Sequence, residues 1–168
     1  EKTEAGYLGL GKRIADNAAN IAINAERIDA LATEMSKANH AIEKASSEVG
    51  YAYESRADAF WGNDGWLAGA GFSAKASTYI PVLPGEVYLY KGYAFGTAVN
   101  ATYYDVNKKK LSVVNGKDSR ADYIELTIPE NCYYAIFASI NKNSNDPDNV
   151  VFSVRKKTGT MTGEIAER

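Results

Sequence analysis

Cysteine and histidine are nearly absent from this sequence, with one of each among 168 residues, Cys132 and His40. A single cysteine excludes an intrachain disulfide framework, and we expect Cys132 to be a core residue of a strand rather than a reactive thiol. The single histidine falls on the outer face of a predicted helix. We therefore expect His40 to face solvent and not to act as a catalytic base.

An excess of positive charge and a long apolar run are also missing. Lysine and arginine number 19 against 21 acidic residues, which gives a formal charge of −2, and the only basic cluster is Lys108 to Lys110. This balance offers no electrostatic footprint for nucleic acid. No run of about 18 apolar residues is present, so no membrane-spanning helix is predicted.

Proline and glycine are absent between Lys12 and Val49, and there an apolar residue returns every seven positions. We assign this series to heptad position a and the residues three further on to position d. The a positions are Ile14, Ile21, Ile28, Met35, Ile42 and Val49, and the d positions are Asn17, Asn24, Leu31, Ala38 and Ala45. A strict seven-residue repeat over this length predicts a left-handed coiled coil, which we place at residues 12–59.

A trimer is preferred over a dimer, because the neighbouring e positions Ala18, Ala25 and Ala32 are small and broaden the apolar face. The alternative is a single amphipathic helix packed on its own domain. Ile at a with Asn at d resembles the trimeric stalks of phage tail fibres and bacterial adhesins. The resemblance implies that Asn17 and Asn24 point inward and could hold an anion on the axis.

The composition changes near residue 60, because all four prolines and most of the tyrosines follow it. Branched and aromatic residues between regular turn signals predict short strands. We place them at 78–82, 86–91, 97–105, 110–114, 123–128, 133–140 and 150–155, with a further short strand near 66–72. The predicted fold class is α+β by segregation, with a long helix followed by an all-β, jelly-roll-like sandwich at residues 60–156. Residues 1–11 and 157–168 are predicted linkers.

Three phrases of the second half are distinctive: Tyr79-Ile-Pro-Val-Leu-Pro-Gly-Glu, Thr102-Tyr-Tyr-Asp-Val-Asn-Lys-Lys and Thr127-Ile-Pro-Glu-Asn-Cys-Tyr-Tyr. They resemble β-sandwich modules in tail-fibre and surface proteins of gut Bacteroidetes and their phages. The resemblance covers roughly residues 60–155 and implies a jelly-roll or carbohydrate-binding-like module. It also implies a place outside the cell, on a virion or a cell surface.

No catalytic motif is found. Gly69-Ala-Gly-Phe-Ser-Ala-Lys75 fits neither a nucleophile elbow nor a dinucleotide loop, and the scattered carboxylates show no pairing in sequence. The loop 141–149 contains Asp146 and Asp148 among oxygen-bearing side chains that calcium could use. A polar turn explains the same residues, and we favour that interpretation.

Aromatic residues are the remaining signal. Trp61, Asn63, Asp64 and Trp66 lie together in a glycine-containing loop, expected at the junction of helix and sheet, where they could bind sugar. The alternative is that these tryptophans pack the last helical turn against the sandwich. A second loop presents Tyr93 and Phe95, and it is the better candidate for exposed aromatics.

These patterns predict a non-enzymatic homotrimeric fibre or adhesin segment whose head binds a cell-surface glycan. Linked weak sites would gain affinity by multivalency. The alternatives are a purely structural spacer or knob, and an accessory module of a larger carbohydrate-active enzyme. No cofactor is expected.

Overall fold

The computed structural model describes residues 2–46 and 51–158 and divides into two compact units, residues 1–39 and 40–168. The first unit belongs to one helix, α1 (Lys2–Ser46). Alanine and other good helix formers dominate this stretch, and three isolated glycines before Lys12 weaken a helix without ending it. The predicted linker at 1–11 is therefore wrong, because Lys2 to Gly11 already belong to α1.

The predicted end of the helix at residue 59 is also wrong. The helix ends at Ser46, and β1 (Tyr53–Gly62) follows. Alanines at 57 and 59 suit a helix locally, but residues 53–62 pair with β2, with a register shift between Ala57 and Ala59. Long-range pairing outweighs weak local propensity here. Val49, the last predicted a position, lies outside the described residues.

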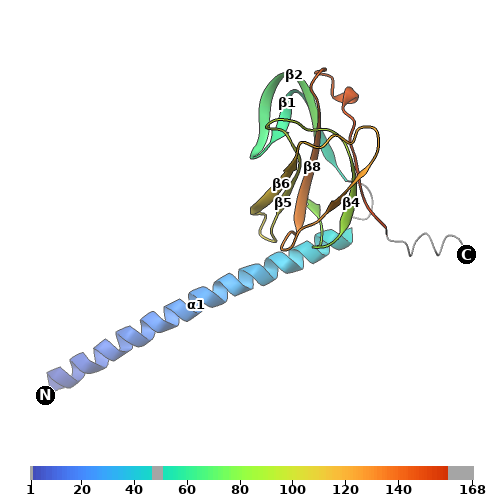
Figure 1. The fold of residues 1–168 in the computed structure, drawn as a ribbon. Helices are drawn as coiled ribbons and strands as arrows, with labels where there is room; N and C mark the ends of the chain where they lie inside the picture. Colours follow the sequence, from blue (N-terminus) through green and yellow to red (C-terminus); the bar gives the residue numbers. More distant parts are fainter. Residues whose placement is uncertain (1, 47–50, 159–168) are drawn as a thin grey trace, which may run out of the picture. The chain divides into compact units, whose positions relative to one another are not determined.

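Within residues 51–158, nine strands form two antiparallel sheets. The other strands are β2 (Gly65–Ser77), β3 (Ile80–Pro81), β4 (Val87–Lys91), β5 (Val99–Tyr104), β6 (Lys110–Asn115), β7 (Ile124–Thr127), β8 (Tyr134–Asn141) and β9 (Ser153–Lys156). The larger sheet has the order β1-β2-β8-β5-β6, with β3 paired to β8, and the smaller has the order β7-β4-β9. Figure 1 shows β8 running between the β1–β2 hairpin and the β5–β6 pair. The predicted strands are found, but β1 was not predicted, and the segment near 66–72 is part of the longer β2.

The core lies between the two sheets. Tyr88 and Tyr90 of β4 pack against Phe137 of β8, with ring centroids 5.7 and 6.4 Å apart. The predicted alternation in β7 places Leu126 on this inner face, 7% exposed. Cys132 is fully buried in the same cluster, as expected of a core residue, although it lies in the turn before β8 rather than in a strand.

The last turns of α1, from His40, belong to the second unit and pack on the sheets. His40 is 4% exposed, and its Nε2 donates to the carbonyl oxygen of Val82 at 2.7 Å. Its ring meets Tyr133 and Tyr134 edge-on, each with centroids 5.1 Å apart. The prediction of a solvent-exposed His40 is therefore wrong. These turns of the helix pack on the β-domain, and the heptad pattern does not predict that contact.

Candidate functional site

Four aromatic rings from three segments form a continuous surface, here called the aromatic patch: Phe60 of β1, Phe72 of β2, and Tyr93 and Phe95 from the segment between β4 and β5. The Tyr93 and Phe95 rings are stacked, with centroids 6.0 Å apart and planes at 14°. Phe72 lies 6.2 Å from Phe95 and 6.0 Å from Phe60. The two predicted loop aromatics, Tyr93 and Phe95, therefore lie side by side. The aromatic surface that they form extends over Phe72 and Phe60 of the β1–β2 hairpin.

The backbone of this segment is held firmly against β8. The Tyr93 N–H donates to Ser139 Oγ at 2.9 Å, and the Tyr93 carbonyl accepts from the Ile140 N–H at 2.9 Å. A Cβ at Gly92 would lie 2.5 Å from the Tyr90 hydroxyl oxygen, so this close approach requires glycine. Ala94 is buried between the two rings, which directs Tyr93 and Phe95 outward on the same side.

Two cationic side chains lie over the patch. Arg120 Cζ is 4.0 Å from the centroid of Tyr93, and Lys142 Nζ is 4.9 Å from that of Phe95. Arg120 also pairs with Asp118, its Nη2 lying 2.7 Å from Oδ2. The hydrogen bond from Arg120 lowers the pKa of Asp118, which stays a charged acceptor beside the rings.

A hollow of about 290 Å³ adjoins the patch and is lined by Phe60, Phe72, Phe95, Gly96, Thr97 and Ala98. Phe95 remains 40% exposed beside it. Exposed ring faces can stack on the C–H faces of a sugar, while Asp118, Arg120 and the Thr97 hydroxyl offer hydrogen-bonding groups nearby. These groups could together stack on and hydrogen-bond to a saccharide unit.

The predicted group Trp61, Asn63, Asp64 and Trp66 is found together, but it forms the end of the β1–β2 hairpin and not a helix-to-sheet junction. Trp61 and Trp66 are cross-strand partners whose rings meet at 90° with centroids 5.6 Å apart. Both pack on a cluster formed by Ala76, Ile136 and Ala138. The expected packing of these tryptophans on the last helical turn is therefore wrong, because hairpin pairing aligns them along the sheet.

The two loop residues of this hairpin are engaged by a lysine. Lys110 Nζ lies 2.9 Å from Asp64 Oδ1 and donates to the Asn63 carbonyl at 3.2 Å. Trp66 also packs with Phe60, Phe72 and Tyr93 around a second small cluster, so it joins the hairpin end to the aromatic patch. Asn63 and Asp64 act here as turn residues, and their role in binding remains a prediction.

The loop at residues 141–149 is a polar turn. Asp146 caps the short helix η1 (Pro147–Asn149), its side chain accepting from the Asp148 N–H at 3.0 Å. The side chain of Asn141 accepts from the Asn143 N–H at 2.9 Å. Within residues 2–46 and 51–158, no group of three His, Cys, Asp or Glu side chains is placed to hold a metal ion.

The predicted seam of α1 is exposed in the single chain. The exposed fractions are 61% for Ile14, 69% for Ile21, 65% for Ile28, 64% for Leu31, 66% for Met35 and 65% for Ile42. Asn17, Asn24, Ala38 and Ala45 are exposed as well. Among the described residues, no helix is both long and apolar enough to cross a membrane.

Sequence reasoning missed Phe60 and Phe72 as members of the patch, and Arg120 and Lys142 as the cations that lie over it. Their only sequence signal is residue type, because they are 12 to 82 positions apart and meet through strand pairing. Comparison of the chain with known protein families, with curated proteins and with solved structures found no match.

Proposed function

We propose that this chain is a non-enzymatic segment of a homotrimeric fibre or adhesin whose β-domain binds cell-surface carbohydrate outside the cell. The helices form a three-stranded coiled coil, and each chain contributes a jelly-roll-like sandwich. Strand order supports the jelly-roll description, since β8 lies between β2 and β5 and the neighbouring strands are distant in sequence.

The observation that carries the proposal is the exposed heptad seam. Ile14, Ile21 and Ile28 are each more than 60% exposed on one chain, at a spacing that one helix alone would not need. Burying each such side chain in a partner would contribute roughly 1.5 to 3 kcal/mol, and the gain repeats once in every heptad of the seam. A helix with such a seam is stable when it is covered by copies of itself.

The two asparagines at d are expected to specify the number and register of the strands rather than to add stability. Asn17 and Asn24 would face the axis of the trimer, where their amides satisfy one another or hold an axial anion. Buried polar groups of this kind reduce stability and specify register and strand number. They therefore support three parallel chains in register.

The aromatic patch supports the binding role. Its stacked Tyr93–Phe95 pair is rigid, partly exposed and flanked by charged groups. One patch per chain gives three identical weak sites per trimer, which suits a repetitive glycan surface.

Light scattering after size exclusion tests the assembly. We expect a mass of about 55 kDa, three times the 18.2 kDa chain. A mass near 18.2 kDa would contradict the fibre and leave the heptads without a partner.

A glycan array probed with the intact chain tests the binding role. We expect reproducible hits that Phe95→Ala reduces and that Tyr123→Ala leaves unchanged, because Tyr123 lies outside the patch against Lys91 and Arg155. The absence of hits from a confirmed trimer would favour the spacer. Hits insensitive to Phe95→Ala would place the glycan elsewhere.

A further inference from the structure

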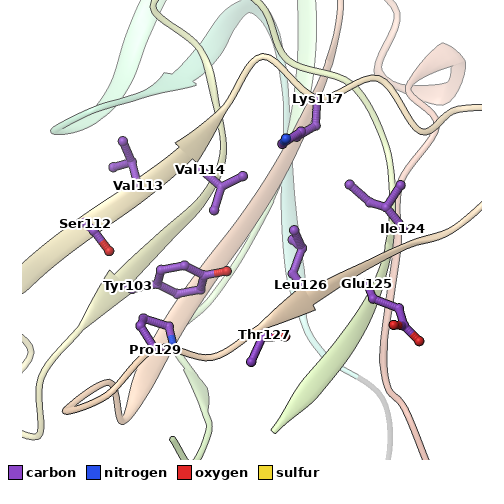
Figure 2. Close-up of a pocket in the computed structure, with 10 residues that line it drawn as sticks. All are labelled: Tyr103, Ser112, Val113, Val114, Lys117, Ile124, Glu125, Leu126, Thr127 and Pro129. Carbon is purple, nitrogen blue, oxygen red and sulfur yellow. The ribbon is translucent and has the colours of Figure 1, made fainter. Parts of the chain in front are cut away.

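A second site lies at the open side of the β-domain, between the free edge of the large sheet and that of the small sheet. The hollow measures about 490 Å³, within the range of small-molecule sites. Its lining comes from β5, β6 and β7 and from the segments that follow them (Figure 2). We call it the edge cleft.

The walls of the edge cleft are mainly apolar. Val114 of β6 faces Leu126 and Ile124 of β7 across the opening, and Pro129 closes one end beside Tyr103. Leu126 is 7% exposed, so its side chain belongs to the core rather than to solvent. These walls would bury the body of an apolar ligand without moving the sheets.

Tyr103 supplies a buried polar group at the floor. Its residue is 4% exposed, and Figure 2 shows its hydroxyl pointing into the cleft. The buried hydroxyl of Tyr90 donates to the Ala138 carbonyl at 2.6 Å. The Tyr103 hydroxyl makes no hydrogen bond within residues 2–46 and 51–158, and it is not one of the buried atoms without a partner there, so its oxygen is accessible from the cleft. A hydroxyl that is accessible from the cleft and has no protein partner can donate a hydrogen bond to, or accept one from, a ligand atom.

Lys117 supplies a cation at the rim. Its backbone is fixed, because its N–H donates to Asn100 Oδ1 and its carbonyl accepts from Asn100 Nδ2, both at 3.0 Å. Its side chain extends toward the cleft in Figure 2 and makes no ion pair among the described residues. The nearby carboxylate of Glu125 points away from the cleft and pairs with Lys157, so it does not neutralise Lys117.

We propose that the edge cleft binds a small amphiphilic carboxylate, a molecule with one aromatic ring or a short aliphatic chain and one anionic group. The apolar body lies between Val114 and Leu126, the carboxylate faces Lys117, and the Tyr103 hydroxyl bonds to a polar atom of the ligand. This site is separate from the aromatic patch, and the inference does not depend on the proposed carbohydrate binding.

The test is a titration of the intact chain with phenylacetate and with hexanoate, followed by amide chemical shifts in NMR. We expect saturable shifts at Val114, Ile124 and Leu126. Tyr103→Phe, which removes one oxygen atom, and Lys117→Gln should each weaken phenylacetate binding about fivefold or more, as the loss of one hydrogen bond predicts. Lys109→Gln is the matched control, because Lys109 is an exposed lysine outside both the cleft and the aromatic patch, and it should leave phenylacetate binding unchanged.

Neutral phenylacetamide separates the contribution of the carboxylate from that of the apolar ring. It should bind the wild-type chain at least about fivefold more weakly than phenylacetate and should be insensitive to Lys117→Gln. Equal affinities would overturn the anionic assignment. Absence of shifts in the cleft at millimolar ligand, or shifts confined to the aromatic patch, would overturn the site itself. Lys117 is exposed, so its variant keeps the test valid even if Tyr103→Phe fails to fold.

Discussion

His40 and Glu86 show how individual residues attach the end of α1 to the β-domain. His40 fills a position between Tyr133 and Tyr134, and the surrounding burial raises the pKa of Tyr134 to about 12. Glu86, in the turn before β4, pairs with Lys44 of the helix at 3.0 Å and with Lys156 of β9 at 2.7 Å. One carboxylate therefore joins three elements that are distant in sequence.

The pH dependence of stability follows from Glu86. Burial alone would raise its pKa, but hydrogen bonds from Lys156, the Leu83 N–H and Lys44 outweigh it and lower the pKa below the ordinary value of 4.5. The stabilisation from the charged form is therefore complete above about pH 4.5 and is lost as the pH falls through the lower, folded-state value. We expect Glu86→Gln to lower the free energy of unfolding at pH 7 by roughly 1 to 3 kcal/mol.

Urea denaturation at several pH values measures this effect. As the pH falls below about 4.5, the wild-type chain should lose stability more steeply than the Glu86→Gln variant does. Glu125→Gln is the control, since Glu125 is exposed and pairs with one lysine only. Parallel pH profiles for wild type and Glu86→Gln would contradict the role assigned to this carboxylate.

At the scale of the element, α1 is the part of the chain on which the proposed trimer depends. Its seam is exposed in one chain, and its interior from Lys12 to Ser46 is free of proline and glycine. The β1–β2 hairpin is the second informative element, because its pairing aligns Trp61 with Trp66 and brings Phe60 beside Phe72.

Replacing Ile21 and Ile28 together by aspartate should abolish the oligomer. The two charges would be buried in the seam, and the cost of burying them exceeds what the remaining contacts supply. We expect the mass from light scattering to fall to 18.2 kDa while the β signal in circular dichroism is retained. Replacement of Lys12 and Asp16, which pair on the exposed surface, by alanine is the control. Trimers that survive the double aspartate change would contradict the seam.

Replacing Asn17 and Asn24 together by isoleucine should raise the melting temperature of the assembly and loosen its strand number. Apolar a and d layers gain stability when buried, but they no longer penalise other registers. Calorimetry and light scattering measure the two effects. A variant with unchanged stability and a single trimeric mass would show that the asparagines do not specify the assembly.

At the scale of the whole molecule, the proposed trimer would link three glycan sites, and this linkage would raise the affinity for a glycan surface. On the glycan surface identified by the array, the trimer should bind about 10² to 10⁴ times more tightly than the monomeric aspartate variant. Surface plasmon resonance at several glycan densities measures the ratio, which should shrink as the density falls. Equal apparent Kd values for trimer and monomer would contradict multivalent binding.

The sequence by itself determined the elements whose signals are local. The seven-residue repeat predicts a long helix, and the alternation in residues 123–128 predicts β7 with the correct inner face, because side-chain direction follows directly from the periods of helix and strand. Tyr93 and Phe95 were predicted as surface aromatics on a different ground, because they lie in a glycine-containing loop between two predicted strands. The start and end of the helix could not be predicted from the sequence. Glycine is tolerated near its start, and residues 53–62, after its end, pair as a strand.

Only the tertiary structure decided which distant residues meet. In the structure His40 is buried, and Trp61 and Trp66 lie on a hairpin rather than at the expected junction. Phe60 and Phe72 also join the aromatic patch, and Arg120 lies over it. It also opened the edge cleft, where the Tyr103 hydroxyl and Lys117 approach the same space from residues 14 positions apart. Such contacts depend on sheet order and packing, which are properties of residue pairs distant in the chain, and no local pattern encodes them.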